Sequence, residues 1–349
     1  MKKKLITILR PALPLALIAF ILLCRFTPSV AEAYARNVYP VISSGLSLLS
    51  SLFTVSLEEP LVAVVVLWLL VWPVCGRRKK MKWRPVLWRE AEVLAWVYIW
   101  FYLGWGLNYF RPSVYVRAQA AQAAYNEKDF LRFLDTYTDA LNRSYTPRFQ
   151  LDREAMDREM KAFYRRVPSS FGLARPHDFQ LPKYFTFTPL YSAVGVLGSM
   201  GPFFAEAQLN EELPPLQLPF TYCHEFSHLL GVSSEAEANY WAYQACIRSS
   251  QPEVRYSGYF GILPYVLLNA SSLLSEEAFH RWAGGIRPEV MEDYRQKRAY
   301  WSAKYNPLVG KVQDYVYDCF LKGNRIASGR KNYAEVVGLL LSVSLPDSL

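Results

Sequence analysis

The stretch that decides the fold reads Thr221-Tyr222-Cys223-His224-Glu225-Phe226-Ser227-His228-Leu229-Leu230-Gly231. It contains two of the four histidines in the chain, His224 and His228, and Glu225 directly follows the first. Side chains four positions apart share one face of a helix. Two imidazoles on one face can bind one metal ion, and a glutamate beside them can act on a metal-bound water molecule. The stretch therefore predicts a metal-binding helix, which Gly231 ends.

A second helix is predicted directly after the first. Ser234 is well placed as its N-cap, and Glu237 then stands at the third helical position of a capping box. This leaves Glu235, in the first turn, able to face back toward the histidines. There it would complete a zinc site of two histidines and one carboxylate, with one position open to water.

Two further residues bear on this site. Asn239 shares the helix face of Glu235 and could hydrogen-bond a ligand histidine. Glu237 is the competing candidate for third ligand, which the capping argument opposes without excluding it.

Composition points to a membrane protein. The chain has 349 residues, a length that allows one large domain or two smaller ones. Its net charge is +9, and 52% of its residues are hydrophobic. Positive charge gathers in short runs beside apolar segments, and no basic stripe is interleaved with aromatic residues. This pattern indicates that the basic residues set the orientation of the chain in a membrane, and it argues against nucleic-acid binding. The five irregularly spaced cysteines indicate no disulfide framework, although a pair among Cys223, Cys246 and Cys319 stays open.

The N-terminal third, residues 1–110, is predicted to be a transmembrane anchor in the lipid bilayer. Apolar spans are expected at about 5–24, 60–75 and 91–110, the first of them retained and not cleaved as a signal peptide. The loop 76–90 carries seven basic residues and one acid, whereas the first loop is acidic overall. The positive-inside rule therefore places the N-terminus in the cytoplasm and everything after the third span outside it.

The remainder, residues 111–349, is predicted to be a mostly helical domain with a small antiparallel sheet between 183 and 210. If the protein is a peptidase, an edge strand of that sheet could pair with an extended peptide. The apolar run 259–274 is either a fourth span or a buried helix, and the polar Asn269, Ser271 and Ser272 favour the buried helix.

The order of histidine, glutamate and asparagine residues in this segment resembles the sequence pattern of a known class of enzymes. His224-Glu225-Phe226-Ser227-His228 followed by Glu235-Ala236-Glu237-Ala238-Asn239 is similar to the gluzincin pattern. With the three spans and the segment Trp105–Arg111, the chain resembles the DUF3810 family of bacterial membrane proteins, which is grouped with zincin-like metallopeptidases. The resemblance implies an α-helical anchor in the bacterial inner membrane plus an α+β zincin-like domain. It also implies His224, His228 and Glu235 as Zn²⁺ ligands and Glu225 as the catalytic base.

The expected function is therefore that of a membrane-anchored zinc metallopeptidase that cleaves peptide or protein substrates outside the cytoplasm. The alternative is a catalytically inactive zincin-fold protein that serves as a binding or assembly factor of the cell envelope. An intramembrane protease is disfavoured because the segment 220–231 is short, polar and preceded by prolines. Candidates for the oxyanion donor are Tyr256, Tyr259 and His280, none of them supported by its spacing.

Overall fold

A computed structural model describes residues 2–147, 150–329, 331 and 335–346, with side chains from residue 12 onward. The chain is mostly helical and divides into two compact units. Unit 1 comprises Met1–Pro112 together with Gly201–Glu206, and unit 2 comprises Ser113–Met200 and Ala207–Leu349. A six-residue internal segment thus groups with the N-terminal part of the chain.

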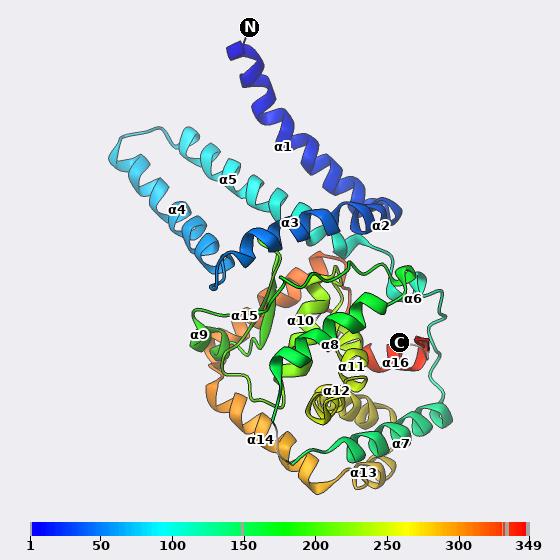
Figure 1. Cartoon of the computed structure of the whole chain (residues 1–349). Coiled ribbons are helices and arrows are strands. Elements are labelled where there is room, and N and C mark those ends of the chain that lie inside the picture. The colour runs from blue at the N-terminus through cyan, green and yellow to red at the C-terminus, as the bar shows by residue number, and fades with distance from the viewer. Residues whose placement is uncertain (1, 148–149, 330, 332–334, 347–349) are drawn as a thin grey trace. The chain divides into compact units, whose positions relative to one another are not determined.

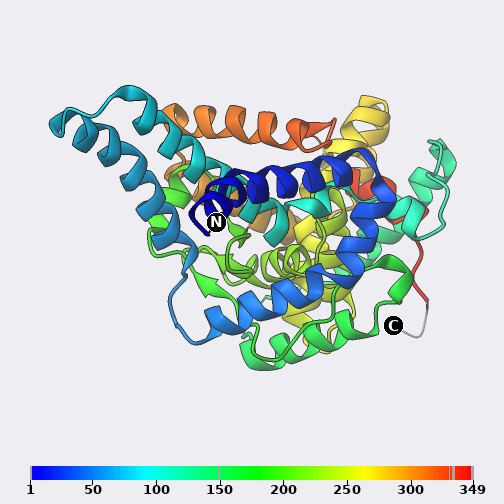
Figure 2. The same ribbon diagram turned by 90° about the horizontal axis from the view of Figure 1, so that it is seen from above.

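Unit 1 consists of helices separated by short breaks. They are α1 (Lys2–Phe26), α2 (Pro28–Asn37), α3 (Tyr39–Ser51), α4 (Glu58–Arg78), α5 (Trp83–Gly104) and the 3-10 helix η1 (Gly106–Phe110). Thr27 precedes a proline and leaves helical geometry (φ −129°, ψ 86°), because the proline ring disfavours the α conformation at the residue before it. The chain therefore bends by 111° between α1 and α2. Helices α4 and α5 lie side by side and run in opposite directions (Figures 1 and 2).

One described helix, α4, is long and apolar enough to cross a membrane. Its side chains are largely uncovered by the rest of the chain, as Leu67 and Leu70 show with exposures of 61% and 66%. The bent pair Ala12–Phe26 and Pro28–Asn37 passes the same test if it is counted as one span. The described chain thus holds one or two candidate spans.

The prediction of three spans is met only in part. Helix α5 covers much of the third predicted span, 91–110, but it begins at Trp83 and carries Arg89, Glu90 and Glu92. With these three charged residues in its first half, α5 is not among the candidate spans of the described chain.

Hydrogen bonds explain why Gly201–Glu206 groups with unit 1. The buried Glu206 carboxylate accepts hydrogen bonds from the Ser50 and Ser56 hydroxyls at 2.5 and 2.6 Å, and from the Leu57 amide at 3.0 Å. The Phe203 amide donates to Glu58 at 3.2 Å. A buried carboxylate needs such donors, so these contacts fix the segment within unit 1.

Unit 2 is helical around a buried centre. Its helices are α6 (Val114–Arg117), α7 (Glu127–Ser144), α8 (Arg153–Arg166), η2 (Ser169–Phe171), α9 (Thr188–Ala193), α10 (Leu218–Leu229), α11 (Glu235–Ile247), α12 (Pro252–Leu273), α13 (Glu276–Ala283), α14 (Pro288–Lys304), α15 (Pro307–Gly323) and α16 (Val336–Ser342). Helix α11 packs between α10 and α12 and lies near the middle of the unit (Figure 1). Phe260, Leu263 and Val266 of α12 are buried, so the apolar run 259–274 forms a core helix.

The sheet of three short strands differs from the predicted one. Its strands are β1 (Lys183–Tyr184), β2 (Gly198–Gly201) and β3 (Glu206–Leu209), in the order β1-β3-β2. The prediction of an antiparallel sheet is wrong for β1 and β3, which run parallel with Lys183 opposite Gln208. The physical reason is that the chain turns into α9 after Phe187 and crosses over before β3, a connection that parallel strands require.

Candidate metal centre

Helix α10 carries the two histidines on a face directed at α11. Pro219 lies in its first turn, where a missing amide hydrogen costs little. Gly231 follows the helix with a φ of +93°, a conformation that favours glycine. Every residue of α10 is buried, so the histidines lie inside unit 2 rather than on its surface.

The second helix begins where the sequence predicts. Ser234 is the N-cap of α11 and accepts a hydrogen bond from the Glu237 amide at 3.4 Å. This confirms the predicted cap. Only residues 230–234 separate α10 from α11, so Glu235 in the first turn is brought back to the histidines.

The described residues contain one group of side chains that could hold a metal ion, and it is the predicted set. One ligand atom from each of His224, His228 and Glu235 lies within 4.8 Å of the other two. Nε2 of His224 is 3.1 Å from Nε2 of His228 and 3.1 Å from Oε2 of Glu235. Nε2 of His228 is 3.4 Å from the same carboxylate oxygen. The three donor atoms therefore surround one point.

The other ring nitrogens of both histidines have partners. Nδ1 of His224 is 2.9 Å from Oδ1 of Asn239, and Nδ1 of His228 is 2.7 Å from the Val232 carbonyl oxygen. Both partners accept hydrogen bonds, so each favours the tautomer with hydrogen on Nδ1. The Nε2 lone pairs then face each other, an arrangement that a shared cation stabilises. Partners of this kind orient histidine ligands in metal sites, and the three side chains fit a metal.

Charge within the group is balanced between the side chains. Burial opposes ionisation of Glu235, but His228 and His224 outweigh it and hold the pKa of its carboxyl well below the usual range. Burial also opposes protonation of His228, yet Glu235 raises the pKa of that imidazole to about 9. A metal cation at the same point would supply the positive charge that the proton supplies, so its binding would release a proton.

The competing candidate, Glu237, faces another partner. Its carboxylate forms a buried ion pair with Arg117 of α6, and it accepts a hydrogen bond from the Trp241 indole at 3.1 Å. Arg117 also donates to the Phe171 carbonyl oxygen. Both carboxylate oxygens of Glu237 are thus engaged away from the histidines, which supports Glu235 as the third ligand.

Glu225 is buried next to strand β2. A side-chain carbon built on Gly198 would lie 2.6 Å from Cγ of Glu225, so only glycine permits this close approach. Burial raises the pKa of Glu225, and the nearby His224 and His228 partly oppose that effect. Because β2 is at the edge of the sheet, the glutamate lies beside an edge strand.

Tyr317 and Tyr265 border the cluster and were not predicted from the sequence. The Tyr317 hydroxyl of α15 donates to Oε1 of Glu235 at 2.5 Å. Burial raises the pKa of Tyr265 of α12 to about 12, and the nearby Glu235 adds to this effect. Tyr317 is 82 residues from Glu235 in sequence, so no local spacing could have revealed the contact.

The predicted oxyanion donors have other surroundings. The Tyr256 hydroxyl donates to Asp293 at 2.6 Å, and the Tyr259 ring packs edge-on against Tyr243. His280 lies on α13, where its side chain is 70% exposed beside Glu276. Of the tyrosines discussed, it is Tyr317 that reaches the ligand set.

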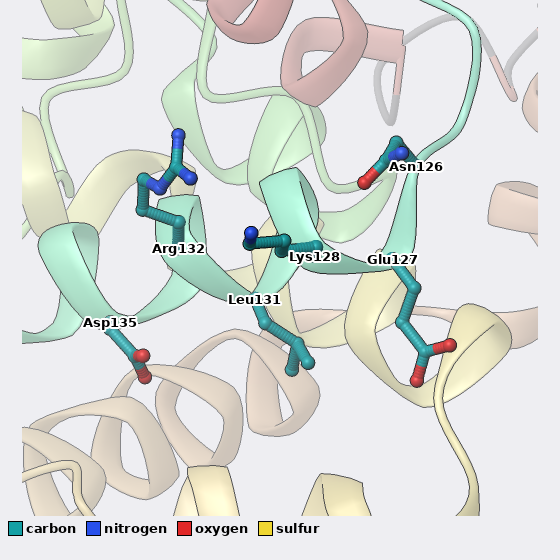
Figure 3. Close-up of a pocket in the computed structure, with 6 residues that line it drawn as sticks. All are labelled: Asn126, Glu127, Lys128, Leu131, Arg132 and Asp135. Carbon is teal, nitrogen blue, oxygen red and sulfur yellow. The ribbon is translucent and has the colours of Figure 1, made fainter.

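A separate hollow lies on the surface of α7 (Figure 3). Its lining comes from that helix and its N-cap alone: Asn126, Glu127, Lys128, Leu131, Arg132 and Asp135. It contains none of the candidate ligands and adds nothing to the metal centre.

Comparison with known proteins identifies the family. The family model described as "Protein of unknown function (DUF3810)" matches residues 34–341, which is most of the chain. The chain therefore belongs to the DUF3810 family, as its resemblance predicted. No curated protein and no solved structure matches it. The relation to zincin-like metallopeptidases stays a prediction.

Proposed function

We propose that this member of the DUF3810 family is a membrane-anchored zinc metallopeptidase, with His224, His228 and Glu235 as ligands and Glu225 as catalytic base. The observation that carries the proposal is the pair of imidazole Nε2 atoms 3.1 Å apart, both within reach of one buried carboxylate oxygen. Two imidazoles and one carboxylate are a donor set typical of zinc peptidases, and three protein ligands leave a fourth position for water.

Each side chain then has a defined task. Bound zinc would activate water and polarise the carbonyl of the scissile peptide bond. Glu225 accepts the water proton and returns it to the leaving amine, a role that suits a buried carboxylate of raised pKa. Asn239 orients the His224 ring, and Tyr317 holds the second oxygen of Glu235. The two tasks together keep the ligands directed at the metal.

The place proposed for the substrate is the edge strand β2. An extended peptide can add to a sheet edge through main-chain hydrogen bonds, and such bonds do not depend on its side chains. A side-chain carbon on Gly198 of β2 would overlap Glu225, so a peptide paired there would present its backbone carbonyl groups near the base. We therefore assign peptides or unfolded protein segments as the substrate class.

Removal of the metal should abolish the activity. We expect the purified full-length chain to cleave members of a mixed peptide library, to lose this activity with a zinc chelator, and to recover it when Zn²⁺ is restored. Mass spectrometry of the products measures each step. Zinc binding without cleavage of any peptide would contradict the peptidase and favour the alternative, an inactive zincin-fold assembly factor of the cell envelope.

We further propose that the chain passes the membrane several times, with its N-terminus in the cytoplasm and unit 2 outside. Basic residues crowd the end of α4, the turn after it and the start of α5, from Arg77 to Arg89, and such basic connections stay in the cytoplasm. Helix α5 returns beside α4, and the long side chains of Arg84 and Arg89 can reach the interface. The lipid bilayer is thus a partner of unit 1.

A reporter fusion tests this orientation. An enzyme that is active only outside the cytoplasm, fused after Pro147, should be active in cells, whereas a reporter fused after Lys80 should be active only in its cytoplasmic form. The reverse pattern at Pro147 would refute the proposed location.

The residues behind the ligands should tune zinc affinity. We expect Tyr317→Phe and Asn239→Ala each to weaken zinc binding roughly 10–100-fold, because each removes a hydrogen bond that orients a ligand. Competition with a fluorescent zinc chelator measures the affinity. Tyr315→Phe is the matched control on α15, since that side chain is 72% exposed and should leave the affinity unchanged. Equal affinities for Tyr317→Phe and the control would remove Tyr317 from the site.

A further inference from the structure

Two cysteines meet at the centre of unit 2. Cys223 lies on α10 directly before His224, and Cys246 lies near the end of α11. Their sulfur atoms are 3.6 Å apart, and neither side chain is exposed to solvent. Sulfur atoms at this distance are in van der Waals contact, with no atom between them. A disulfide bond would require them to approach by only about 1.5 Å more.

Neighbouring residues hold both cysteines in place. Tyr164 donates a hydrogen bond to the Cys223 carbonyl oxygen at 2.8 Å. A side-chain carbon built on Gly258 of α12 would lie 2.6 Å from Cβ of Cys246, so α12 holds Cys246 closely. Cys319, the other cysteine of unit 2, is exposed. The sequence leaves open any pairing among Cys223, Cys246 and Cys319. Among these described cysteines, the structure brings Cys223 and Cys246 together.

We propose that Cys223 and Cys246 form a disulfide bond in the protein as it exists in the cell. The inference rests on the proposed location of unit 2 outside the cytoplasm, where disulfides persist. The two thiols together give up two protons and two electrons. An external disulfide, acting as the oxidant, takes up these protons and electrons and is reduced to two thiols. Because the folded pair is buried, the exchange takes place before α10 and α11 have packed together.

The cross-link would join the two helices that carry the candidate ligands. It keeps His224 and His228 close to Glu235 whether or not a metal is bound. A disulfide also restricts the unfolded chain between its cysteines. Reduction should therefore lower the thermal unfolding midpoint of the full-length chain, by roughly 5–10 °C.

Mass spectrometry tests the bond directly. Cells that express the full-length chain are quenched in acid, and the denatured protein is alkylated with iodoacetamide and digested without reductant. We expect the peptides that contain Cys223 and Cys246 to be recovered joined, lighter than their sum by two hydrogen atoms, and Cys319 to be alkylated. Recovery of Cys223 and Cys246 as alkylated peptides would overturn the inference and leave them as buried thiols that only fill space.

Two variants sharpen the result. Cys319→Ser should leave the cross-link unchanged, whereas Cys246→Ser should leave Cys223 alkylated. A cross-link that survives Cys246→Ser would overturn the assigned pairing. The bond does not require zinc, so its presence or absence says nothing against the peptidase. The reporter fusion at Pro147 tests the location separately, and free thiols in a unit 2 shown to lie outside would overturn the disulfide alone.

Discussion

A Glu225→Gln variant is expected to bind zinc as the wild-type chain does and to hydrolyse peptides about 10²–10⁴ times more slowly. Glutamine fills nearly the same volume beside Gly198, so α10 and the three ligands keep their places. The amide cannot accept the proton of the attacking water, and that step is the one assigned to Glu225. The measurement compares zinc content and the rate of peptide cleavage for the two full-length proteins.

The matched control for this substitution is Glu211→Gln. Glu211 is an exposed carboxylate of unit 2, and its loss should change neither zinc content nor cleavage rate. Wild-type hydrolysis by Glu225→Gln would rule out Glu225 as the base. Loss of zinc from the variant would show instead that Glu225 supports the ligands.

An Arg117→Met variant should lose about 3–5 kcal/mol of stability, because it leaves the Glu237 carboxylate buried without its counter-charge. The side chains of Arg117 and Glu237 are 5% and 4% exposed, so water cannot replace the lost partner. For a domain of this size the thermal unfolding midpoint should fall by roughly 6–20 °C. The midpoint is measured on the full-length chain in detergent.

A surface pair provides the control for this effect. Arg158 lies 3.8 Å from Glu154 on α8, with the two side chains 68% and 91% exposed. Arg158→Met should cost less than about 1 kcal/mol, because water screens an exposed pair. If Arg117→Met were as stable as Arg158→Met, another group would have to compensate the negative charge of the buried Glu237 carboxylate. The structural role assigned to Glu237 would then lose its support. The choice of Glu235 over Glu237 as the third ligand would lose support as well.

The grouping of the candidate ligands could be predicted because its signals are local. The spacing of His224 and His228 depends only on the helix period, and the N-cap at Ser234 only on short-range hydrogen bonds. Glu235 follows within the same short segment, so its return to the histidines needs only one tight turn. These contacts span fewer than about a dozen residues, and helix geometry fixes most of them.

The rest of the site depends on contacts between distant segments. Tyr317 reaches Glu235 across 82 residues, and Arg117 reaches Glu237 across 120. The parallel pairing of β1 with β3 and the grouping of Gly201–Glu206 with unit 1 are likewise set by packing between distant parts of the chain. Sequence periodicity carries no information about such partners. Helix α5 is not among the candidate spans for a different reason, since the charges at its start shorten its apolar part.

We expect His224, His228 and Glu235 to bind one zinc ion together. Elemental analysis of the purified full-length chain, normalised to protein amount, tests it most directly. The wild type should contain about one zinc ion per chain, and a His224→Ala variant should contain none. A wild-type chain without zinc, or a His224→Ala variant with as much zinc as the wild type, would contradict it.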